Sequence, residues 1–455
     1  MTLSLELAER VSALSFGDLP RDALHAAELS LADALCVMLA AVRLEPATDP
    51  FHRHAHSGGR GPSTLLAGGT ATPALAALAN GTLAHALDFE DTYDAAGLHP
   101  NAVIIPAALA LSEAEGSSGA DFLLAIVAGC DAACRLGDAL AADPAARGWY
   151  HPPMIAAAGA AFGAARLLGL TPEHMVSAVA LALCQFSLTD ELKRSPRSSL
   201  RVVRDGFAAK AVVEACLLAR AGVTGVEAPL EGESGLFRML TGEGPAGDVL
   251  AGFGTSFAGT RVTLKQWPSC RGTHPYIALA LELRDRGILA GQIDSLSLSV
   301  KRPDDMLMLP ETDRRRPATI AAAKFSIPYC FALGLHAGRV DLDGFSDSHR
   351  TDDTILSVAS KIRLDEVLAY DDRRAPEARL RLTDGRELTV VVPDPPVIAA
   401  ALTSFSDIDE KLQDCLTHAG RPKIKADLLR AITALRNSPS LMDLSACVRS
   451  QPMHR

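Results

Sequence analysis

Apolar residues recur at helical spacing through about the first 260 residues of the chain. Positions three or four apart share one face of an α-helix, so this period predicts one helix after another. Gly169 and Gly222 follow two of these segments, as expected of residues that end helices. The helices predicted here cover residues 21–41, 73–85, 101–115, 120–140, 154–168, 172–184 and 207–221.

The pattern changes beyond residue 260. Residues 292–301 alternate between apolar and polar positions, which is typical of a β-strand. Residues 378–393 form two alternating runs around Asp384-Gly385, which predicts a β-hairpin. Helical segments at 274–286 and 318–336 lie among these strands, so residues 262–395 are predicted to form a smaller α+β domain. The chain is helical again after Pro395-Pro396.

The amino-acid composition limits the classes of function that this chain could have. A chain of 455 residues is long enough for two domains, and with only 5% aromatic residues its core is built mainly from Ala, Leu and Val. A net charge of −10 argues against a nucleic-acid partner, so an anionic ligand would need a local basic patch. No signal peptide and no membrane-spanning run is expected. Nine scattered cysteines indicate reduced thiols and a cytoplasmic location.

Three His-Pro pairs, at His99, His151 and His274, each precede an apolar helical segment. Proline suits the first helical turn, which places each histidine at or beside the N-cap. The positive end of a helix favours carboxylates and a neutral imidazole, a good combination for proton transfer. The alternative is that His-Pro only starts helices.

An acidic segment and a short run of histidines contain further candidate functional residues. Residues 85–99 carry Asp88, Glu90, Asp91 and Asp94, which could hold Mg²⁺, act as acid or base, or form a solvated turn; for an acidic loop in general the solvated turn is favoured. Alternating histidines at 52, 54 and 56 are expected to be solvent-exposed on a loop.

Residues 193–204 are strongly basic. Arg201 and Arg204 are three apart and would share a face of a helical turn, where their guanidinium groups could clamp a di- or tricarboxylate. The alternative is a solvated basic loop. A second patch runs from Lys265 to His274, at the predicted domain junction. No motif indicates a nucleotide, PLP or zinc.

Taken in order, several motifs resemble the MmgE/PrpD family, which includes 2-methylcitrate dehydratase, cis-aconitate decarboxylase and iminodisuccinate epimerase. The motifs are HALDFEDTY followed by His99-Pro100, GWYHPP at 148–153, GFAAKAVVEACLLARAGVTG at 206–225, LKQWPSCRGTH at 264–274 and AKFSIPY at 323–329.

The resemblance implies a mainly α fold, with a large all-helical domain built from both chain ends (1–261 and 396–455) and a smaller inserted α+β domain (262–395). It also implies an active site between the domains, no cofactor, no metal, a homodimer, and a small di- or tricarboxylate as substrate. Asp88, Thr92, His99, His151 and Lys265 match the family's active-site positions. Cys270 stands where the decarboxylases carry histidine, Arg201 and Arg204 replace a usual lysine and histidine, and Glu90 replaces a usual aspartate.

These observations predict an enzyme that abstracts a proton α to a carboxylate, with a 2-methylcitrate dehydratase-like hydro-lyase as the first hypothesis. His151 or Asp88 would be the base, His99 the acid, and Arg201, Arg204 and Lys265 would hold carboxylates. The alternative is a cofactor-free epimerase of an amino- or imino-dicarboxylate, with Tyr150 beside His151 as one base and His99 or Lys265 as the other. Decarboxylation and a non-catalytic binding protein rank lower. Thr92, Cys270 and His274 are the further predicted substrate-binding residues.

Overall fold

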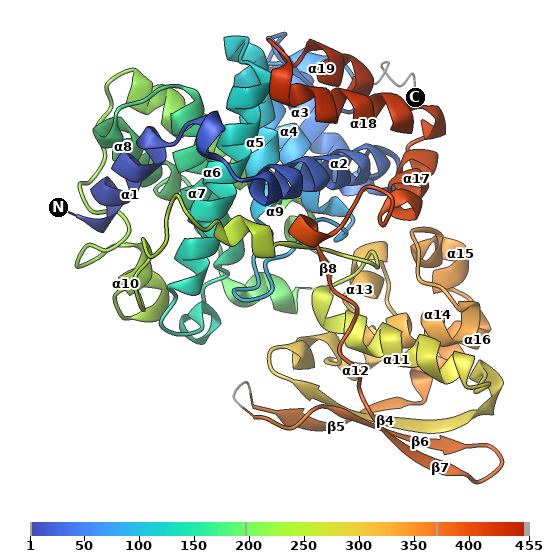
Figure 1. The fold of residues 1–455 in the computed structure, drawn as a ribbon. Helices are drawn as coiled ribbons and strands as arrows, with labels where there is room; N and C mark the ends of the chain where they lie inside the picture. Colours follow the sequence, from blue (N-terminus) through green and yellow to red (C-terminus); the bar gives the residue numbers. More distant parts are fainter. Residues whose placement is uncertain (1, 196–197, 370–371, 450–455) are drawn as a thin grey trace. The chain divides into compact units, whose positions relative to one another are not determined.

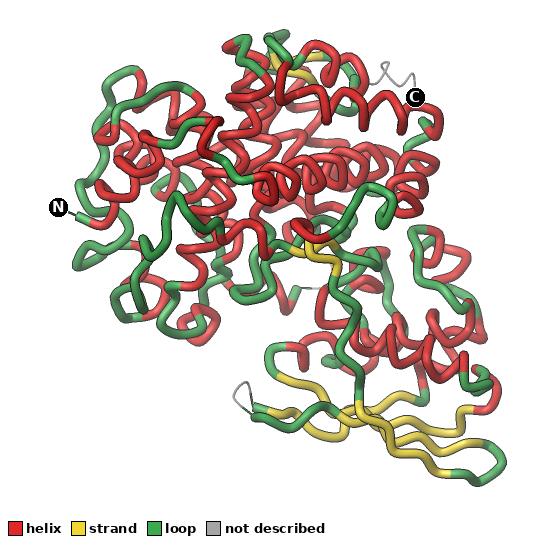
Figure 2. Tube along the Cα trace, viewed as in Figure 1, coloured by secondary structure: helices red, strands yellow, loops and turns green. Residues whose placement is uncertain are grey.

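The computed structural model describes residues 2–195, 198–369 and 372–449. The fold is mainly α, as predicted (Figures 1 and 2). The chain divides into two compact units, a larger one made of residues 1–192, 199–264 and 398–455, and a smaller one made of residues 193–198 and 265–397. Within the described residues, no helix combines the length and apolar character needed to cross a bilayer.

The larger unit holds most of the helices. They are α1 (Leu3–Ala13), α2 (Arg21–Leu44), α3 (Asp49–Ser57), α4 (Pro73–Ala86), α5 (Pro100–Glu115), α6 (Gly119–Asp138), α7 (Pro152–Leu167), α8 (Pro172–Leu183), α9 (Leu200–Arg220), α10 (Leu236–Thr241), α17 (Asp409–His418), α18 (Lys425–Ala434) and α19 (Met442–Val448).

Alanine-rich helices form the centre of this unit. In α5, α6 and α7 almost every residue is buried, and a helix that is apolar on all sides belongs inside a core. The C-terminal helices α17 and α18 pack on α2, so an N-terminal and a C-terminal segment of the chain lie side by side (Figure 1). Small side chains let these helices approach closely.

Two expectations for this unit were wrong. It is not all-helical, because short antiparallel pairs join β1 (Ser63–Thr64) to β2 (Thr70–Ala71) and β3 (Thr263–Leu264) to β8 (Ile398–Ala399). The alternating histidines lie on helix α3 and not on a loop, and His52 is buried. Burial lowers the pKa of His52 to about 4, so this ring is a neutral core residue.

The smaller unit is a four-stranded sheet covered by helices. Its elements are α11 (His274–Asp285), β4 (Ile293–Lys301), α12 (Glu311–Arg315), α13 (Ile320–Lys324), α14 (Ile327–Ala337), α15 (Asp347–Arg350), α16 (Asp353–Ser360), β5 (Ile362–Leu368), β6 (Glu377–Leu382) and β7 (Glu387–Val391). The strand order is β5-β4-β6-β7, with β4 parallel to β5 and antiparallel to β6. The predicted hairpin is confirmed as β6–β7, with Gly385 at φ +88° in its turn.

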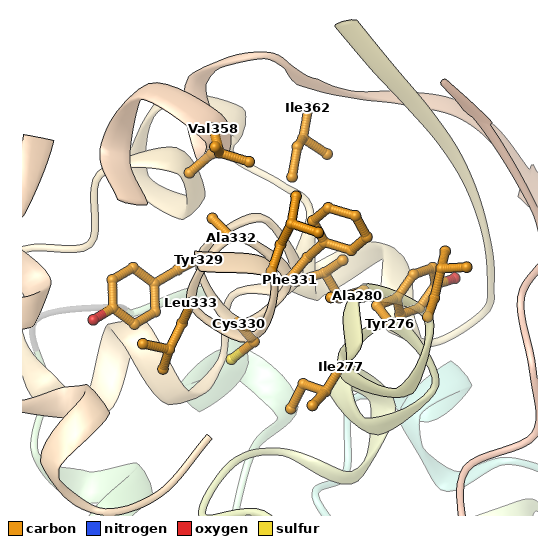
Figure 3. Packing of buried hydrophobic residues seen from close by; sticks show 14 of the residues in the cluster. Tyr276, Ile277, Ala280, Tyr329, Cys330, Phe331, Ala332, Leu333, Val358 and Ile362 are labelled. Atoms are coloured by element: carbon orange, nitrogen blue, oxygen red, sulfur yellow. The ribbon is translucent and has the colours of Figure 1, made fainter. Parts of the chain in front are cut away.

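Helix α14 occupies the middle of this unit's core. Figure 3 shows its Tyr329, Phe331 and Leu333 side chains among residues of α11, α16 and β5. The single helix predicted over 318–336 is in fact two, α13 and α14. Ser326 accepts a hydrogen bond from the Tyr329 amide and Pro328 occupies the first turn, so a new helix must begin there.

Helices α4 and α9 touch backbone to backbone in the larger unit. A Cβ added to Gly81 would lie 2.8 Å from Cα of Gly206, and one added to Gly206 would lie 2.5 Å from the Leu78 carbonyl oxygen. Only glycine fits at this crossing. The backbone contact at Gly81 and Gly206 sets the distance between α4 and the arginines at the start of α9.

We expect Gly206→Ala to lower the free energy of unfolding by about 1–3 kcal/mol, because the added methyl group must push the two helices apart. Urea titration followed by circular dichroism measures this. Gly17→Ala is the control, since Gly17 is exposed and its added Cβ would meet only the Ser15 hydroxyl at 3.9 Å. A loss for Gly206→Ala no larger than that of the control would contradict the close packing of α4 and α9.

Candidate active site

All three His-Pro pairs stand at helix starts, as predicted. His99 is the N-cap of α5, His151 is the N-cap of α7, and His274 is the first residue of α11. Neither N-cap imidazole accepts a hydrogen bond from the amides of its own helix. Both rings are turned toward other groups.

His99 is held through its Nδ1 atom. This nitrogen lies 2.9 Å from the Asp91 backbone oxygen and 3.1 Å from Oε1 of Glu90. A carbonyl oxygen can only accept a hydrogen bond, so Nδ1 carries the proton. The neutral ring then has its lone pair on Nε2, which is the atom suited to exchange a proton.

His151 has the opposite tautomer. Its Nε2 lies 3.0 Å from the carbonyl oxygen of Ala96, in the segment that joins Asp88 to His99. Nε2 therefore donates, and the lone pair of the neutral ring is on Nδ1. The two predicted histidines thus present different ring nitrogens for proton transfer.

A third histidine, His85, completes the cluster from the last turn of α4. Its Nδ1 contacts Oε1 of Glu90 and lies 3.9 Å from Oδ2 of Asp205. The rings of His85 and His99 are 5.0 Å apart between centroids. Glu90 is only 1% exposed and holds both rings with the same oxygen.

The acidic segment is not a solvated turn, so that expectation was wrong. Asp88, Glu90 and Asp91 are buried, and only Asp94 of the four is exposed. Asp88 has φ +50°, the one positive value at a non-glycine residue in the described chain. Such a conformation persists only where the surroundings over-determine it. The segment folds inward because buried cations and imidazoles face its carboxylates.

Lys411 of α17 supports this segment from the C-terminal part of the chain. Its Nζ donates to the Phe89 carbonyl oxygen at 2.7 Å, lies 2.6 Å from Oδ1 of Asp33, and stands 4.1 Å from the Phe89 ring centroid. Phe89 lies between Asp88 and Glu90. A residue more than 300 positions away therefore fixes the backbone that carries both carboxylates.

Asp91 has a raised pKa. Asn101 donates to its Oδ2 at 2.6 Å. Burial raises the pKa of Asp91 to about 8; the Asn101 hydrogen bond and Lys411 oppose the rise, whereas Glu90 and Asp33 add to it. The Asp91 side chain is therefore mostly protonated near neutral pH.

The predicted pair Arg201 and Arg204 lies in the first two turns of α9, so this part of the basic segment is helical. The Arg204 guanidinium stacks 4.8 Å from the Tyr150 ring centroid, and its Nε is 3.6 Å from Oδ2 of Asp205. Burial alone would lower the pKa of Arg204, but nearby Asp205 and other anionic groups outweigh it and raise the pKa. Arg204 therefore stays cationic although it is 1% exposed.

The Tyr150 ring lies against the Arg204 guanidinium. Burial raises the pKa of this phenol above its ordinary value, with Arg204 and Arg201 opposing the rise. Tyr150 can therefore donate a hydrogen bond but is a poor base at neutral pH. A cavity of about 210 Å³ beside it is lined by Leu188, Arg204, Lys210 and neighbouring residues. It offers open volume next to a buried cation.

Four of these residues could hold a divalent cation. His85, Asp88, Glu90 and His99 each offer one ligand atom, and these atoms lie within 4.8 Å of one another. Nδ1 of His99 donates to the backbone, so His99 would have to offer Nε2. The expectation of a metal-free site stays a prediction.

Seven predicted site residues belong to the larger unit: Asp88, Thr92, His99, Tyr150, His151, Arg201 and Arg204. Thr92 is buried and exchanges two 2.8 Å backbone hydrogen bonds with Thr263. The Asp88 carboxylate contributes to the raised pKa values of Arg204 and Tyr150, so the acidic segment lies near α9 and Tyr150. Their individual roles remain predictions.

Three predicted residues belong to the smaller unit. Lys265 is buried, and the half-buried Cys270 donates its amide to the Lys324 carbonyl oxygen at 3.0 Å. His274 is fully buried, with Nε2 3.2 Å from the Trp267 carbonyl oxygen and Nδ1 3.2 Å from Nη1 of Arg271. The roles of these residues also remain predictions.

Sequence reasoning did not single out His85, Asp205 or Lys411. His85 precedes Asp88 by three residues at a helix end, a spacing that could have indicated a shared site. Asp205 adjoins Arg204 and could have been expected to neutralise it. No local signal connects Lys411 with Phe89.

The larger unit therefore buries imidazole and carboxylate groups near Arg204. The MmgE/PrpD N-terminal domain matches residues 5–247, and the MmgE/PrpD C-terminal domain matches residues 267–436. The chain belongs to the MmgE/PrpD family.

The chain is similar to several proteins of known name. It is 26% identical to a cis-aconitate decarboxylase-like protein, oryM, of Aspergillus oryzae over 386 residues, which cover 79% of this chain and 78% of that protein. It is 24% identical to cis-aconitate decarboxylase of Aspergillus terreus over 479 residues, 98% and 96% of the two chains. It is 26% identical to cis-aconitate decarboxylase of Homo sapiens over 302 residues, 64% and 61% of the two chains. Its relatives are therefore lyases of this enzyme family.

The raised pKa of Asp91 predicts a pH dependence of stability. Between its ordinary value of 3.8 and about 8, the folded carboxyl keeps a proton that the unfolded chain releases, so stability falls as the pH rises through this range. We expect the free energy of unfolding to fall by a few kcal/mol, at roughly 1.4 kcal/mol per pKa unit, and Asp91→Asn to remove most of this fall. Urea midpoints at about pH 5 and about pH 8 measure it. Asp94→Asn, on the exposed part of the segment, should keep the wild-type pH dependence; the same persistence in Asp91→Asn would contradict the assignment.

Removal of the Lys411 ammonium should destabilise the larger unit strongly. Lys411→Met leaves the buried Asp33 carboxylate without this cation and the Phe89 carbonyl without this donor, at a cost of about 3–5 kcal/mol. The matched control is Lys425→Met, whose partner Asp409 is half exposed at 2.7 Å and whose loss should cost about 0–1 kcal/mol. Equal losses in the two variants, measured by urea unfolding, would show that Lys411 does not have this structural role.

Proposed function

We propose that this chain is a hydro-lyase that abstracts a proton α to a carboxylate of a small di- or tricarboxylic acid, in the manner of 2-methylcitrate dehydratase. The observation that carries the proposal is the pair His99 and His151, with lone pairs on different ring nitrogens, in one unit with Arg201 and Arg204. Elimination of water needs both a base and an acid, and this pair can supply one of each.

The α-proton of a carboxylate is very weakly acidic, so the site must stabilise the charge that develops on the substrate. In the proposed step, Nδ1 of His151 takes the α-proton, with Asp88 as the other candidate base. The electron pair of the broken C–H bond forms the alkene as the C–O bond breaks. Protonated His99, whose positive charge Glu90 stabilises, gives the Nε2 proton to the departing hydroxyl, which leaves as water.

Arg201 and Arg204 are proposed to bind substrate carboxylates. Arginine matches a carboxylate with two parallel N–H donors and does not deprotonate, so it binds without taking part in proton transfer. Arg204 already faces Asp205, whereas Arg201 is only partly buried. We therefore assign the larger share of substrate binding to Arg201.

Decarboxylation is the second candidate, and the names of the similar proteins favour it. It requires loss of CO₂ from an unsaturated acid and delivery of one proton to carbon, which His99 could perform. Cys270 counts against it, since the family resemblance places a histidine there in decarboxylases. The epimerase alternative needs a second base, and the raised pKa of Tyr150 makes this residue a poor one.

Two further expectations accompany the proposal. All nine cysteines are free thiols in the structure, which fits a reducing cytoplasm. A homodimer is expected from the family resemblance alone. Both remain predictions, to be checked by localisation in cells and by light scattering.

The reaction is tested with a proton NMR screen of citrate, 2-methylcitrate, cis-aconitate and dicarboxylic amino acids in deuterated buffer. An alkene proton signal from a hydroxy acid supports dehydration. Loss of a carboxyl group from cis-aconitate would show that the reaction is decarboxylation and not dehydration. Deuterium exchange at Cα without any other change would show that the reaction is epimerisation. Folded protein that produces none of these would overturn the proposal.

With a substrate in hand, we expect His99→Gln to lower kcat by about 10²–10⁴, because it removes the proton donor. Arg201→Gln should mainly raise KM, because it removes a carboxylate partner. Arg430→Gln is the matched control, since Arg430 forms an exposed ion pair with Asp427 and should leave both constants unchanged. A wild-type kcat in His99→Gln would show that His99 is not the proton donor.

A further inference from the structure

The carboxylate of Glu90 occupies an unusual place between two histidines. Its Oε1 contacts Nδ1 of His85 and lies 3.1 Å from Nδ1 of His99. Glu90 is 1% exposed and His85 is 2% exposed, so water does not compete for these contacts. One carboxylate oxygen therefore serves two imidazole N–H groups.

Both histidines have a fixed proton position as a result. At His99, the Asp91 carbonyl oxygen at 2.9 Å and Glu90 both accept from Nδ1. At His85, Glu90 and Asp205 are both on the Nδ1 side. The hydrogen bond at one ring nitrogen sets the tautomer of a neutral histidine, so these acceptors favour Nδ1–H at both rings.

The length of the Glu90 side chain matters for this arrangement. The family resemblance places an aspartate at this position, and glutamate extends one methylene further from the backbone. The extra reach lets Oε1 meet a ring on α4 and a ring at the start of α5 at once. An aspartate on the same backbone would be too short for both contacts.

We infer that Glu90 is a positioning residue, which uses one oxygen to hold His85 and His99 by their Nδ1–H groups and so presents Nε2 of His99, the nitrogen that gains and gives the transferred proton, to the reaction. The inference rests on the proposed function for its catalytic part, since Glu90 would act through His99. The tautomers themselves do not depend on any substrate. Titratable and charged groups near the pair are Asp88 and the mostly protonated Asp91 of the same segment, and Arg204 and Asp205 of α9.

The first test is nitrogen NMR of protein labelled with ¹⁵N histidine. His99 and His85 are assigned from the signals lost in His99→Gln and His85→Gln. In the wild type we expect protonated Nδ1 and unprotonated Nε2 for both rings when they are neutral. An Nε2–H tautomer at either ring of the folded wild-type protein would overturn the inference, whether or not a substrate is known.

The second test uses Glu90→Gln and Glu90→Asp. We expect His85 to change to the Nε2–H tautomer in both variants, because the neutral amide of glutamine accepts more weakly than a carboxylate and aspartate reaches less far toward the two rings. With substrate, kcat should fall at least tenfold with little change in KM, and Glu90→Asp should not restore it. Unchanged tautomers or wild-type kcat in these variants would contradict the positioning role.

Glu28→Gln provides the matched control. Glu28 is also buried and accepts two N–H groups, from Arg436, but it lies outside the histidine cluster. It should lower stability while leaving the imidazole signals and kcat unchanged. If Glu28→Gln lowers kcat as much as Glu90→Gln, the effect of Glu90 is structural only. If no substrate is found but both rings show Nδ1–H, the positioning geometry stands and only the proposed reaction fails.

Discussion

The crossing of α4 and α9 at Gly81 and Gly206 is the constraint on which the rest of the site depends. His85 follows Gly81 by one helical turn, and Arg204 and Asp205 immediately precede Gly206. Backbone contact at the glycines therefore brings an imidazole, a carboxylate and a guanidinium within a few ångströms. A larger residue at either glycine would separate the helices and the charged groups with them.

Burial then gives these groups their chemical character. An isolated charge in a low-dielectric interior is costly, so each buried ion needs a partner or loses its charge. Arg204 keeps its charge because Asp205 faces it, whereas Asp91 keeps a proton that an exposed aspartate would lose. Burial also leaves His52 neutral, although it is not among the predicted site residues, so a shifted pKa alone does not mark a functional residue.

The family assignment establishes the kind of enzyme to which the chain is related, whereas the residues of the site bear on the particular reaction. The MmgE/PrpD match covers both parts of the chain and establishes the kind of enzyme to which it is related. The similar decarboxylases share only about a quarter of its residues, which leaves room for another reaction on the same fold. Arg201, Arg204, Glu90 and Cys270 are the positions at which the family resemblance leads us to expect other residues. All of them except Glu90 are among the predicted site residues.

Local sequence determined the elements of this protein. Helical periodicity, His-Pro pairs and the Asp384-Gly385 turn predicted α2, α5, α7 and the β6–β7 hairpin, because these signals act within a few residues. Missed elements have a local explanation too: β5 is a charged edge strand without clear alternation, and Ser326 with Pro328 divides the predicted 318–336 helix.

Tertiary structure alone decided which charged residues are buried together. The residues of the acidic segment 88–94 alone predict a solvated turn. The segment is buried because Lys411, His85 and Asp205 of other helices lie beside it. The tautomers of His99 and His151 likewise follow from carbonyl oxygens that only the folded chain places beside them. Sequence supplies the ionisable groups, but the free energy of each charge depends on neighbours that are distant in the chain.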